Sequence, residues 1–544
     1  WNNPANWSCG FVPYSVTDIS IPDVTNEPVI GSGDTGNAAN ITIVPGSSLT
    51  VAGGTIRIHG SVAGNDNFNV SDGTAEFCGS AAQSVGAGIF TGNTVRNLTV
   101  NNVAGLTLLG PLNVRGIVLV QSGALVSGGH LTLLSDAVQT ALIDGSGIGE
   151  VTGTVTMQRY LPSKYGYKYF GSPFTGATVS EFGDDMDLAS SFPMFYRYDE
   201  SRTSSGWVAY ATGTAPLNPM EGYAVNFGAT ALPWTVDVTG VVNNGSLSVT
   251  LYNHGHTYTD GFNLVGNPYP SPIRWSLPGW TKTNIDNAVY YFRASDTDEY
   301  GGTYSSFVNG VSSDGFASDT IPSMQGFFVR VSNGTFPVTG TLGVTNSVRI
   351  NDMTQPFLKS AKASGQYGKS ADAQERFLVR MSAAFTDDQA SADPLVVYFD
   401  DAAEPAFDTE LDALKLFNTD MMVPNFYSVL LPEKKLSING IPYQTDTAFY
   451  VPLGLTIYRD GELSFRIRDV DNLPPEERIY FRDALTGANV NMLRTNEYKV
   501  NLTQGEYHGR FSLAFVKSTT GITDGEAADD LFRAYISGEL VRTI

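Results

Sequence analysis

A pattern of glycine, proline and aromatic residues occurs twice in this 544-residue chain, and it constrains the fold more than any other feature. Each copy opens with Gly-polar-Pro-aromatic, passes through an aromatic run, and closes with Pro, Met, a polar residue, Gly and an aromatic residue. The openings lie at Gly171 and Gly266, and the closings at Gly222 and Gly326. Three matched landmarks in the same order indicate an internal duplication. Neither copy contains an obvious reacting group, so the pattern predicts architecture rather than chemistry.

The repeated residue types are those that tight turns and close packing require. We expect the glycines to take a positive φ or to let another backbone approach closely. The neighbouring prolines and aromatic residues should lock these turns and cover them. Aromatic runs between frequent Gly/Pro turns predict a duplicated antiparallel β-sandwich module over residues 158–345, with copies at about 169–227 and 264–331.

Residues 1–157 consist of short apolar runs separated by Gly, Asn, Ser and Asp, for example Ile41–Val44 and Leu98–Val100. The runs alternate with period two, which predicts strands, and no helical stretch interrupts them. Short strands with a corner every few residues are typical of a solenoid. We predict an all-β chain that begins with a right-handed parallel β-helix; a β-sandwich is the alternative for this region.

The remaining chain divides by composition. Residues 346–375 contain small, polar and basic residues without periodicity and are predicted to be a linker. Strand-like runs resume over residues 376–517 and predict a further β-sandwich, in which Leu411–Phe417 is the only candidate helix. Residues 518–544 begin with a Gly/Asp/Thr spacer.

The overall composition favours an extracellular β protein. Charged residues make up only 16% of the chain, and the formal net charge is -22. Such a field repels nucleic acid and anionic membranes, so neither is an expected partner. The two cysteines, Cys9 and Cys78, allow one disulfide in an oxidising compartment, and the sequence leaves this pairing open.

Several phrases resemble large surface proteins of Bacteroidetes. They are Trp1–Trp7 with the following short strands, Val151–Leu161 at the end of the predicted helix, and Gly261–Ile273 in the second copy. The resemblance implies β-helical repeats in an extracellular or cell-surface, adhesin-like protein. We expect Trp1 and Trp7 to cap the open end of the solenoid, where an uncovered rung would invite edge pairing.

The last residues resemble the beginning of a C-terminal sorting domain of the type IX secretion system. A spacer precedes a strand, a Gly turn and a second strand within Leu531–Val541. The resemblance implies export across the outer membrane, with the type IX outer-membrane translocon and a sortase as partners. The residues assigned to this truncated sorting signal are Leu531, Phe532, Tyr535, Gly538 and Leu540.

Motifs for common enzyme chemistry are absent from the sequence: it contains no nucleophile elbow, zinc-protease helix, phosphate loop or dinucleotide fingerprint. His254 and His256 would point to the same side of a strand, but without a third ligand nearby a solvated hairpin tip is favoured over a metal site. Cys78 with His59 suggests a thiol nucleophile, although a buried cysteine of a solenoid rung is the preferred interpretation.

Two acidic loops have the oxygen ligands that Ca²⁺ prefers. We assign a hypothetical calcium site to each, against the simpler reading of solvated turns; otherwise no cofactor is expected. The candidate ligands are Asp469, Asp471 and Asn472 in one loop and Asp296, Asp298 and Glu299 in the other.

A ligand of the carbohydrate class is the other possibility. Tyr290, Tyr291, Tyr300 and Tyr304 are predicted to stack on sugar rings if they are exposed, and to be core and surface tyrosines otherwise. β-Helices also host polysaccharide lyases, which need cationic groups on the solenoid face. Residues 1–150 contain only three arginines and no lysine, which argues against acidic-polysaccharide chemistry.

The sequence therefore favours a non-catalytic, secreted or surface-bound adhesin-like protein that is not an enzyme. The alternative is an extracellular carbohydrate-binding or polysaccharide-degrading protein that uses the β-helix face. A groove of carboxylates and aromatic residues in residues 1–157 would favour the alternative. A smooth Ser/Thr/Asn face would favour the adhesin.

Overall fold

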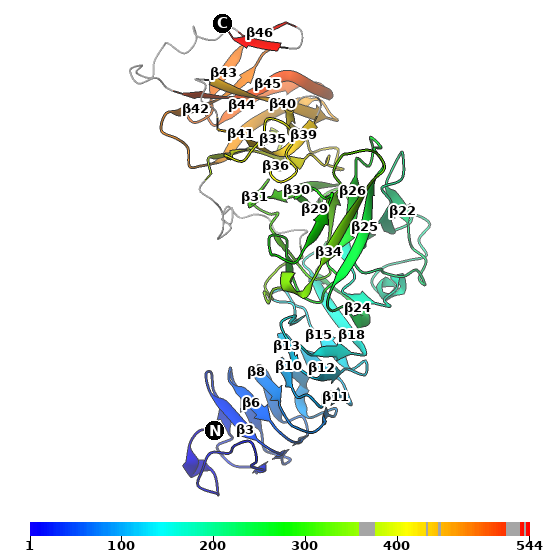
Figure 1. The fold of residues 1–544 in the computed structure, drawn as a ribbon, viewed down its shortest axis with the longest axis vertical. Helices are drawn as coiled ribbons and strands as arrows, with labels where there is room; N and C mark the ends of the chain where they lie inside the picture. The colour runs from blue at the N-terminus through cyan, green and yellow to red at the C-terminus, as the bar shows by residue number, and fades with distance from the viewer. Residues whose placement is uncertain (358–375, 431–433, 444–447, 518–533, 538–539, 544) are drawn as a thin grey trace. The chain divides into compact units, whose positions relative to one another are not determined.

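The computed structural model describes the chain except for residues 358–375, 431–433, 444–447, 518–533, 538–539 and 544. It divides into two compact units, each described here by itself. The first comprises Trp1–Lys369 with Leu416–Asp420, and the second Ser370–Lys415 with Met421–Ile544. Nearly all regular structure is β (Figure 1), which confirms the predicted fold class. The described helices are short 3-10 turns: η1 (Pro4–Asn6), η2 (Val179–Phe182) and η3 (Asn346–Val348).

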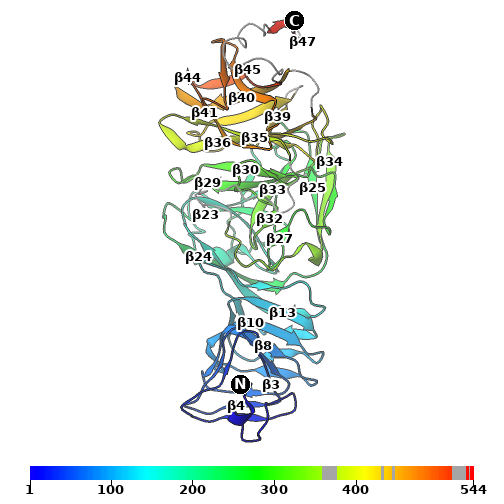
Figure 2. The same cartoon turned by 90° about the vertical axis from the view of Figure 1, so that its left-hand side faces the viewer.

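The first unit begins with the predicted parallel β-helix. Its strands stack in parallel from rung to rung, as in the pairing of Ile19 with Ile41 and of Ile41 with Val62. Figures 1 and 2 show the successive rungs in blue and cyan. The strands are β1 (Ile19–Ile21), β2 (Val29–Ile30), β3 (Thr35–Ala38), β4 (Ile41–Ile43), β5 (Leu49–Val51), β6 (Thr55–Ile58), β7 (Val62–Ala63), β8 (Phe68–Phe77), β9 (Gln83–Val85), β10 (Phe90–Asn101), β11 (Leu106–Leu108), β12 (Leu112–Val114), β13 (Ile117–Ser122), β14 (Ala124–Val126), β15 (Leu131–Leu133), β16 (Leu142–Ile143), β17 (Glu150–Thr152) and β18 (Thr154–Leu161).

The period of two determines which side chains enter the solenoid. In β4, Ile41 and Ile43 are buried and Thr42 between them is exposed, because successive side chains point to opposite faces. Asparagines form the corners: the Asn40 carboxamide oxygen accepts hydrogen bonds from the backbone N–H and hydroxyl of Ser61, both at 2.8 Å. Each rung thus buries a small apolar face and satisfies its corner through the next rung.

Two tryptophans cover the first rung, as the sequence predicts. Trp1 is buried, and a methyl group added at Gly36 would lie 2.9 Å from its ring and 2.6 Å from Ile30. Trp7 packs edge-on against Trp1 with ring centroids 5.0 Å apart, and its indole N–H donates to the Trp1 carbonyl at 2.9 Å. The indoles therefore shield the apolar side chains that the first rung would otherwise expose.

At its other end the solenoid changes from parallel to antiparallel pairing. Strand β18 pairs in parallel with β15 on one side. On its other side it pairs antiparallel with β24 (Trp234–Val242), from Thr154 opposite Val241 to Leu161 opposite Trp234. The solenoid sheet consequently continues into the module without a break in hydrogen bonding.

The module consists of two copies with the same strand order, so the repeat in sequence is a repeat in structure. The first sheet has the order β19-β23-β21-β22, and the second β26-β33-β29-β30-β31. Smaller sheets, β25-β34-β28 and β27-β32, accompany them. The strands are β19 (Tyr167–Gly171), β20 (Phe174–Thr175), β21 (Phe195–Tyr198), β22 (Trp207–Ala209), β23 (Gly222–Asn226), β25 (Leu247–Asn253), β26 (Phe262–Gly266), β27 (Ile273–Arg274), β28 (Thr281–Thr283), β29 (Val289–Ala294), β30 (Gly302–Val308), β31 (Val311–Ser312), β32 (Thr320–Ile321), β33 (Gly326–Arg330) and β34 (Val338–Val344).

The copies meet at their repeated glycines. Gly171 pairs with Gly222 in one sheet, and Gly266 pairs with Gly326 in the other. A methyl group on Gly171 would lie 2.5 Å from the Gly266 Cα, and one on Gly266 would lie 2.5 Å from the Gly171 Cα. None of the four has a positive φ. Of the two expected roles, close approach of another backbone is therefore the one observed.

The positive φ angles belong to the methionines that precede the closing glycines. Met220 and Met324 have φ of 63° and 62°, and both side chains are buried. The Gly171 N–H donates to the Met324 carbonyl at 3.0 Å, and the Gly266 N–H donates to the Met220 carbonyl at 3.2 Å. Each closing turn thus binds the opening strand of the other copy, so the two copies exchange contacts reciprocally.

Residues after β34 attach the module to the solenoid. The Arg349 guanidinium donates to the Ile143 carbonyl and, at 2.8 Å, to the Ser271 hydroxyl. Further along, the buried Arg159 donates to the Gln355 carbonyl at 2.8 Å. The first part of the predicted linker, residues 346–357, is therefore packed on the first unit, and residues 358–375 lie outside the described part of the chain.

The main sheet of the second unit has the order β43-β42-β45-β40-β38-β39-β36-β35-β41-β44, with β37 paired to β39 beside this path, and it surrounds an aromatic core. Phe426 and Phe481, from distant strands of that order, both pack on Phe465, at 5.4 and 4.7 Å between ring centroids. The sheet thus folds onto itself. Its strands, with the terminal hairpin, are β35 (Leu378–Phe385), β36 (Asp388–Phe399), β37 (Ala413–Leu414), β38 (Asn425–Leu430), β39 (Lys434–Ile441), β40 (Ala448–Ile457), β41 (Gly461–Asp471), β42 (Glu477–Asp483), β43 (Ala488–Asn491), β44 (Glu497–Leu502), β45 (Gly505–Lys517), β46 (Ala534–Ser537) and β47 (Leu540–Thr543).

The candidate helix over Leu411–Phe417 is wrong. Ala413 and Leu414 form β37, which pairs with β39 through Ala413 opposite Ile438 and Leu414 opposite Leu436. Both side chains are buried. Strand pairing and burial override the moderate helix propensity of this segment.

Candidate functional site

Two of the four tyrosines proposed as a sugar-stacking surface are core residues. Tyr290 and Tyr291 are 1% and 0% exposed, because β29 is covered on both faces. The Tyr291 hydroxyl donates to the Ser318 carbonyl at 2.8 Å, and burial raises the pKa of this phenol well above its usual value. Their assignment to an exposed ligand surface is therefore wrong.

The other two tyrosines differ in exposure. Tyr304 is partly buried, and its hydroxyl is 2.8 Å from the hydroxyl of Tyr169. Tyr300, in the loop between β29 and β30, is 52% exposed. Among the four, Tyr300 is the side chain that a ligand in solution can reach most directly.

Tyr300 belongs to a larger group of rings that the sequence analysis did not identify. Phe192, itself 51% exposed, packs edge-on against Tyr300 with ring centroids 5.5 Å apart, and the Tyr167 ring lies 6.4 Å from that of Tyr300. Tyr196 is 6.2 Å from Tyr167. Because these rings come from three separate segments, no local spacing in the sequence marks them as a group.

The β29–β30 loop, which carries Tyr300, also carries three acidic residues. The carboxylates of Asp296, Asp298 and Glu299 act on the Tyr165 phenol, whose pKa is raised by partial desolvation and then by these negative charges, led by Glu299. We call the four rings of Tyr167, Phe192, Tyr196 and Tyr300 the aromatic patch.

The other acidic loop is neutralised by an arginine. Arg380 contacts Asp469 at 3.1 Å and Asp471 at 3.3 Å, and the Asn472 side-chain amide donates to the Arg376 carbonyl at 2.9 Å. An arginine thus contacts one carboxylate oxygen of each aspartate that was proposed as a calcium ligand. In the described residues, neither this loop nor the one at Asp296, Asp298 and Glu299 brings three His, Cys, Asp or Glu side chains into a metal-binding group.

The paired histidines are held by a buried glutamate. The rings of His254 and His256 stack at 5.8 Å, as their i, i+2 spacing predicts. His254 Nδ1 is 2.6 Å from the Glu200 carboxylate, which also accepts the His254 and Gly261 N–H groups. The arrangement positions a loop tip, and the described part of the chain provides no further metal ligand there.

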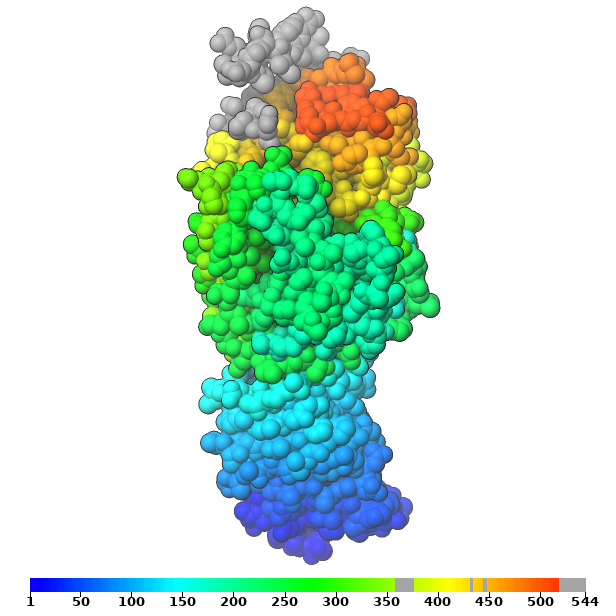
Figure 3. All heavy atoms as spheres, turned by 90° about the vertical axis from the view of Figure 1, so that its right-hand side faces the viewer, coloured from blue at the N-terminus to red at the C-terminus, as the bar shows by residue number. Residues whose placement is uncertain are grey.

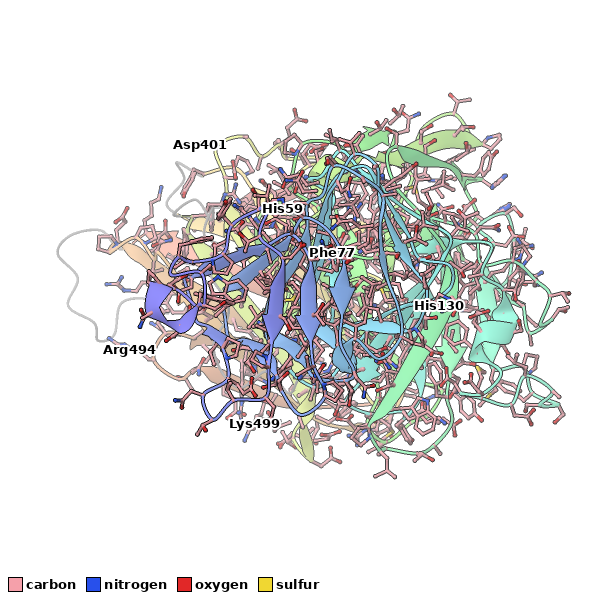
Figure 4. All side chains as sticks on the ribbon, turned by 90° about the horizontal axis from the view of Figure 1, so that it is seen from below. His59, Phe77, His130, Asp401, Arg494 and Lys499 are labelled. Atoms are coloured by element: carbon pink, nitrogen blue, oxygen red, sulfur yellow. The ribbon has the colours of Figure 1, made fainter. Side chains whose placement is uncertain are left out.

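Cys78 has no activated thiolate. Its Sγ is 3.6 Å from His59 Nε2, but burial and then the charge of Glu76 raise the pKa of the thiol to about 11. Ile58 pairs with Phe77 in the register, which brings His59 alongside Cys78; His59 and Phe77 are labelled in Figure 4. A protonated thiol is a poor nucleophile. Cys9 and Cys78 are both free thiols in the structure, with no disulfide between them.

One row of the solenoid's outer surface carries small polar side chains, although apolar side chains such as Leu109 and Ile148 are exposed elsewhere on it. Asn113, Thr132 and Thr156 are adjacent in the register of β12, β15 and β18. The arginines are paired, as in Arg57 with Glu76 at 2.8 Å and Arg115 with Asp136 at 3.4 Å. Figure 3 shows one face of the solenoid in blue to cyan.

The proposed sorting signal is described only in part. Tyr535 and Leu540 lie on β46 and β47, which pair antiparallel from Ala534 opposite Thr543 to Ser537 opposite Leu540. Leu531, Phe532 and Gly538 lie outside the described residues. In the portion of the chain that the structure describes, no helix is long and apolar enough to cross a membrane.

Comparison with known proteins gives one distant relative and a family. The chain is 22% identical over 367 residues to the minor fimbrium subunit Mfa5 of Porphyromonas gingivalis, an alignment that covers 64% of this chain and 28% of that protein. The chain therefore spans less than a third of the relative's length. No solved structure matches it. The model of a family described as Domain of unknown function (DUF8693) matches residues 1–77 and 79–515, and the chain belongs to this family.

Proposed function

We propose that this chain is part of a non-catalytic, adhesin-like protein of the bacterial cell surface, exported by the type IX secretion system. The observation that carries the proposal is the similarity to a fimbrial subunit over 64% of the chain. A stack of parallel rungs capped by Trp1 suits a surface stalk, because its strands repeat along one axis.

Three features support a role without catalysis. The Cys78 thiol has a raised pKa, the solenoid arginines are paired with carboxylates, and Tyr290 and Tyr291 are packed in the core. Each candidate for chemistry thus has a structural explanation. The proposal includes no resident cofactor. Calcium binding can be checked separately by titrating Ca²⁺ into the protein and measuring the unfolding temperature, which we expect to stay constant.

The export route rests on the resemblance of residues 518–544 to a sorting domain. In the full-length gene, deletion from Leu531 onward should retain the protein inside the cell. The matched control is an internal substitution, Tyr258→Ala, at an exposed side chain remote from this segment in sequence. Normal secretion of the deletion variant would contradict the export proposal and would remove the translocon and sortase as partners.

A carbohydrate-active protein is the second candidate, favoured by the exposed Tyr300 ring. A glycan array combined with a reducing-sugar release assay separates the two. We expect no sugar release from any polysaccharide. Specific cleavage would contradict the non-catalytic proposal, whereas binding without cleavage would be compatible with an adhesin.

A further inference from the structure

A buried carboxylate of the first copy of the module orients a histidine that lies just before the second copy. Glu200, between β21 and β22, has a side chain that is 3% exposed, and its Oε2 lies 2.6 Å from Nδ1 of His254. The same carboxylate accepts the backbone N–H groups of His254, at 3.1 Å, and of Gly261, at 3.3 Å. Because an ionised carboxylate only accepts hydrogen bonds, Nδ1 of His254 carries the proton. Its Nε2 is therefore the nitrogen with the free lone pair, on a side chain that is 29% exposed.

A second imidazole lies against the first. The ring of His256 stacks on that of His254, with centroids 5.8 Å apart and an interplanar angle of 10°. Within the part of the chain that the structure describes, no hydrogen bond engages the His256 ring. One imidazole is thus fixed by a buried carboxylate, while its neighbour can turn its ring nitrogens toward the same point in solvent.

This arrangement matches the way proteins prepare histidines for metal ions. Neutral imidazole is a good ligand for Zn²⁺, Cu²⁺ and Ni²⁺. A histidine that binds a metal usually donates its other ring N–H to a carboxylate, which fixes the ring and raises the basicity of the free nitrogen. The turn itself does not depend on the imidazole, because the backbone N–H groups of His254 and Gly261 bind the same carboxylate.

We propose that Nε2 of His254 and a ring nitrogen of His256 chelate one divalent transition-metal ion, of the class of Zn²⁺ and Cu²⁺, with Glu200 as the positioning residue. Water or an incoming ligand takes the remaining coordination positions, since the described residues bring no group of three His, Cys, Asp or Glu side chains together. The inference goes beyond the proposed function, because it assigns a metal site to the module and does not depend on the export route.

Calorimetric titration of the full chain with Zn²⁺, without an affinity tag, measures the site directly. We expect one Zn²⁺ per chain and binding that is at least about tenfold weaker in His256→Ala, because loss of a ligand costs no less than loss of its supporting carboxylate. The matched control is His508→Ala. Nε2 of His508 lies 2.8 Å from the Glu506 carboxylate, but its described ring contact is with Tyr427 and not with a second imidazole. This variant should bind Zn²⁺ like the parent.

Two further measurements complete the test. The electron paramagnetic resonance spectrum of the Cu²⁺-loaded chain should show coupling to two imidazole nitrogens, and to one in His256→Ala. Glu200→Gln can still accept the backbone N–H groups, and it should weaken Zn²⁺ binding by about tenfold. Equal Zn²⁺ affinity of the parent and His256→Ala, or an equal loss in His508→Ala, would overturn the proposal. So would identical Cu²⁺ spectra of the parent and His256→Ala.

Discussion

Gly171 and Gly266 face each other across the two copies of the module, with so little space that a methyl group on either would lie 2.5 Å from the other's Cα. Gly171→Ala should therefore lower the unfolding free energy by about 1–3 kcal/mol, because neither backbone can move without disturbing its sheet. Gly213→Ala is the control, since its added methyl would meet nothing closer than Ser180, at 3.7 Å. Urea unfolding of both variants tests this, and equal midpoints would show that the contact is not as tight as described.

The turn at Met324 gives a second prediction, on backbone conformation. Met324 has a φ of 62°, which favours glycine over any residue with a Cβ. Met324→Gly should therefore be more stable than Met324→Ala by about 1 kcal/mol, although glycine removes more of the side chain. At Met157, which is buried in β18 and does not have a positive φ, the order should reverse. If the glycine variant were not the more stable of the two at Met324, backbone strain at this residue would be refuted.

Asp185 makes stability depend on pH in the acidic range. Burial, and next the charges of Asp184 and Asp237, raise the pKa of its carboxyl to about 6 from 3.8, while the Trp234 indole N–H donates to it at 2.6 Å. Because the folded state binds this proton more tightly than the unfolded state, the carboxyl's contribution favours folding more as pH falls from about 6 to about 4. Asp185→Asn should flatten this part of the profile of unfolding free energy against pH.

Trp234 provides an internal probe of the same titration. Its fluorescence should change near pH 6 in the parent chain and not in Asp185→Asn, because the indole N–H contacts the titrating carboxyl. In the second unit, burial raises the pKa of the Asp412 carboxyl to about 7. Protonation of Asp412 therefore also favours folding as the pH falls. An unchanged stability profile and an unchanged fluorescence transition in the variant would together refute the assignment.

A buried ion pair in the second unit should respond differently to single and double substitution. Lys415 Nζ contacts both Asp393 oxygens, at 2.6 and 2.7 Å, and both side chains are almost fully buried. Lys415→Met should cost about 3–5 kcal/mol, because it leaves a buried carboxylate without its ammonium partner. Lys415→Met/Asp393→Asn should recover much of this loss, since the asparagine oxygen can still accept the Phe426 N–H.

The exposed pair Arg115–Asp136 is the control for that experiment. Its side chains are 48% and 46% exposed, so Arg115→Met should cost less than about 1 kcal/mol. Chemical unfolding of the full chain measures all three variants. If the double variant were no more stable than Lys415→Met, the unpaired carboxylate of Asp393 would not be the cause of the destabilisation.

The fold was predictable where one face of a strand is buried and the other is not. In β4 the alternation of Ile41, Thr42 and Ile43 predicts which side chains point into the core. The same prediction fails for β29, because both faces of this strand are buried and its apolar residues do not alternate with polar ones. The uninterrupted apolar run Val289–Phe292 is the signal that would have placed Tyr290 and Tyr291 inside, because such runs are typical of doubly covered strands.

Contacts between distant segments account for the other errors and omissions. Arg380 precedes Asp469 by 89 residues, so the sequence around the aspartates does not reveal their cation. The rings of the aromatic patch likewise come from three separate segments of the sequence, around Tyr167, Phe192–Tyr196 and Tyr300. For the repeated glycines the sequence left two roles open, a positive φ or the close approach of another backbone. That the missing space is taken by the other copy follows from the reciprocal pairing of Phe170 with Gln325 and of Glu221 with Val265.

Detection of the protein on intact cells tests the central claim, a surface location, most directly. Antibodies raised against residues 1–157 would be applied to cells that express the full-length gene, before and after the outer membrane is permeabilised. A periplasmic marker protein that stays unlabelled on intact cells is the control. The account predicts equal labelling of the solenoid before and after permeabilisation. Labelling that appears only after permeabilisation would contradict it.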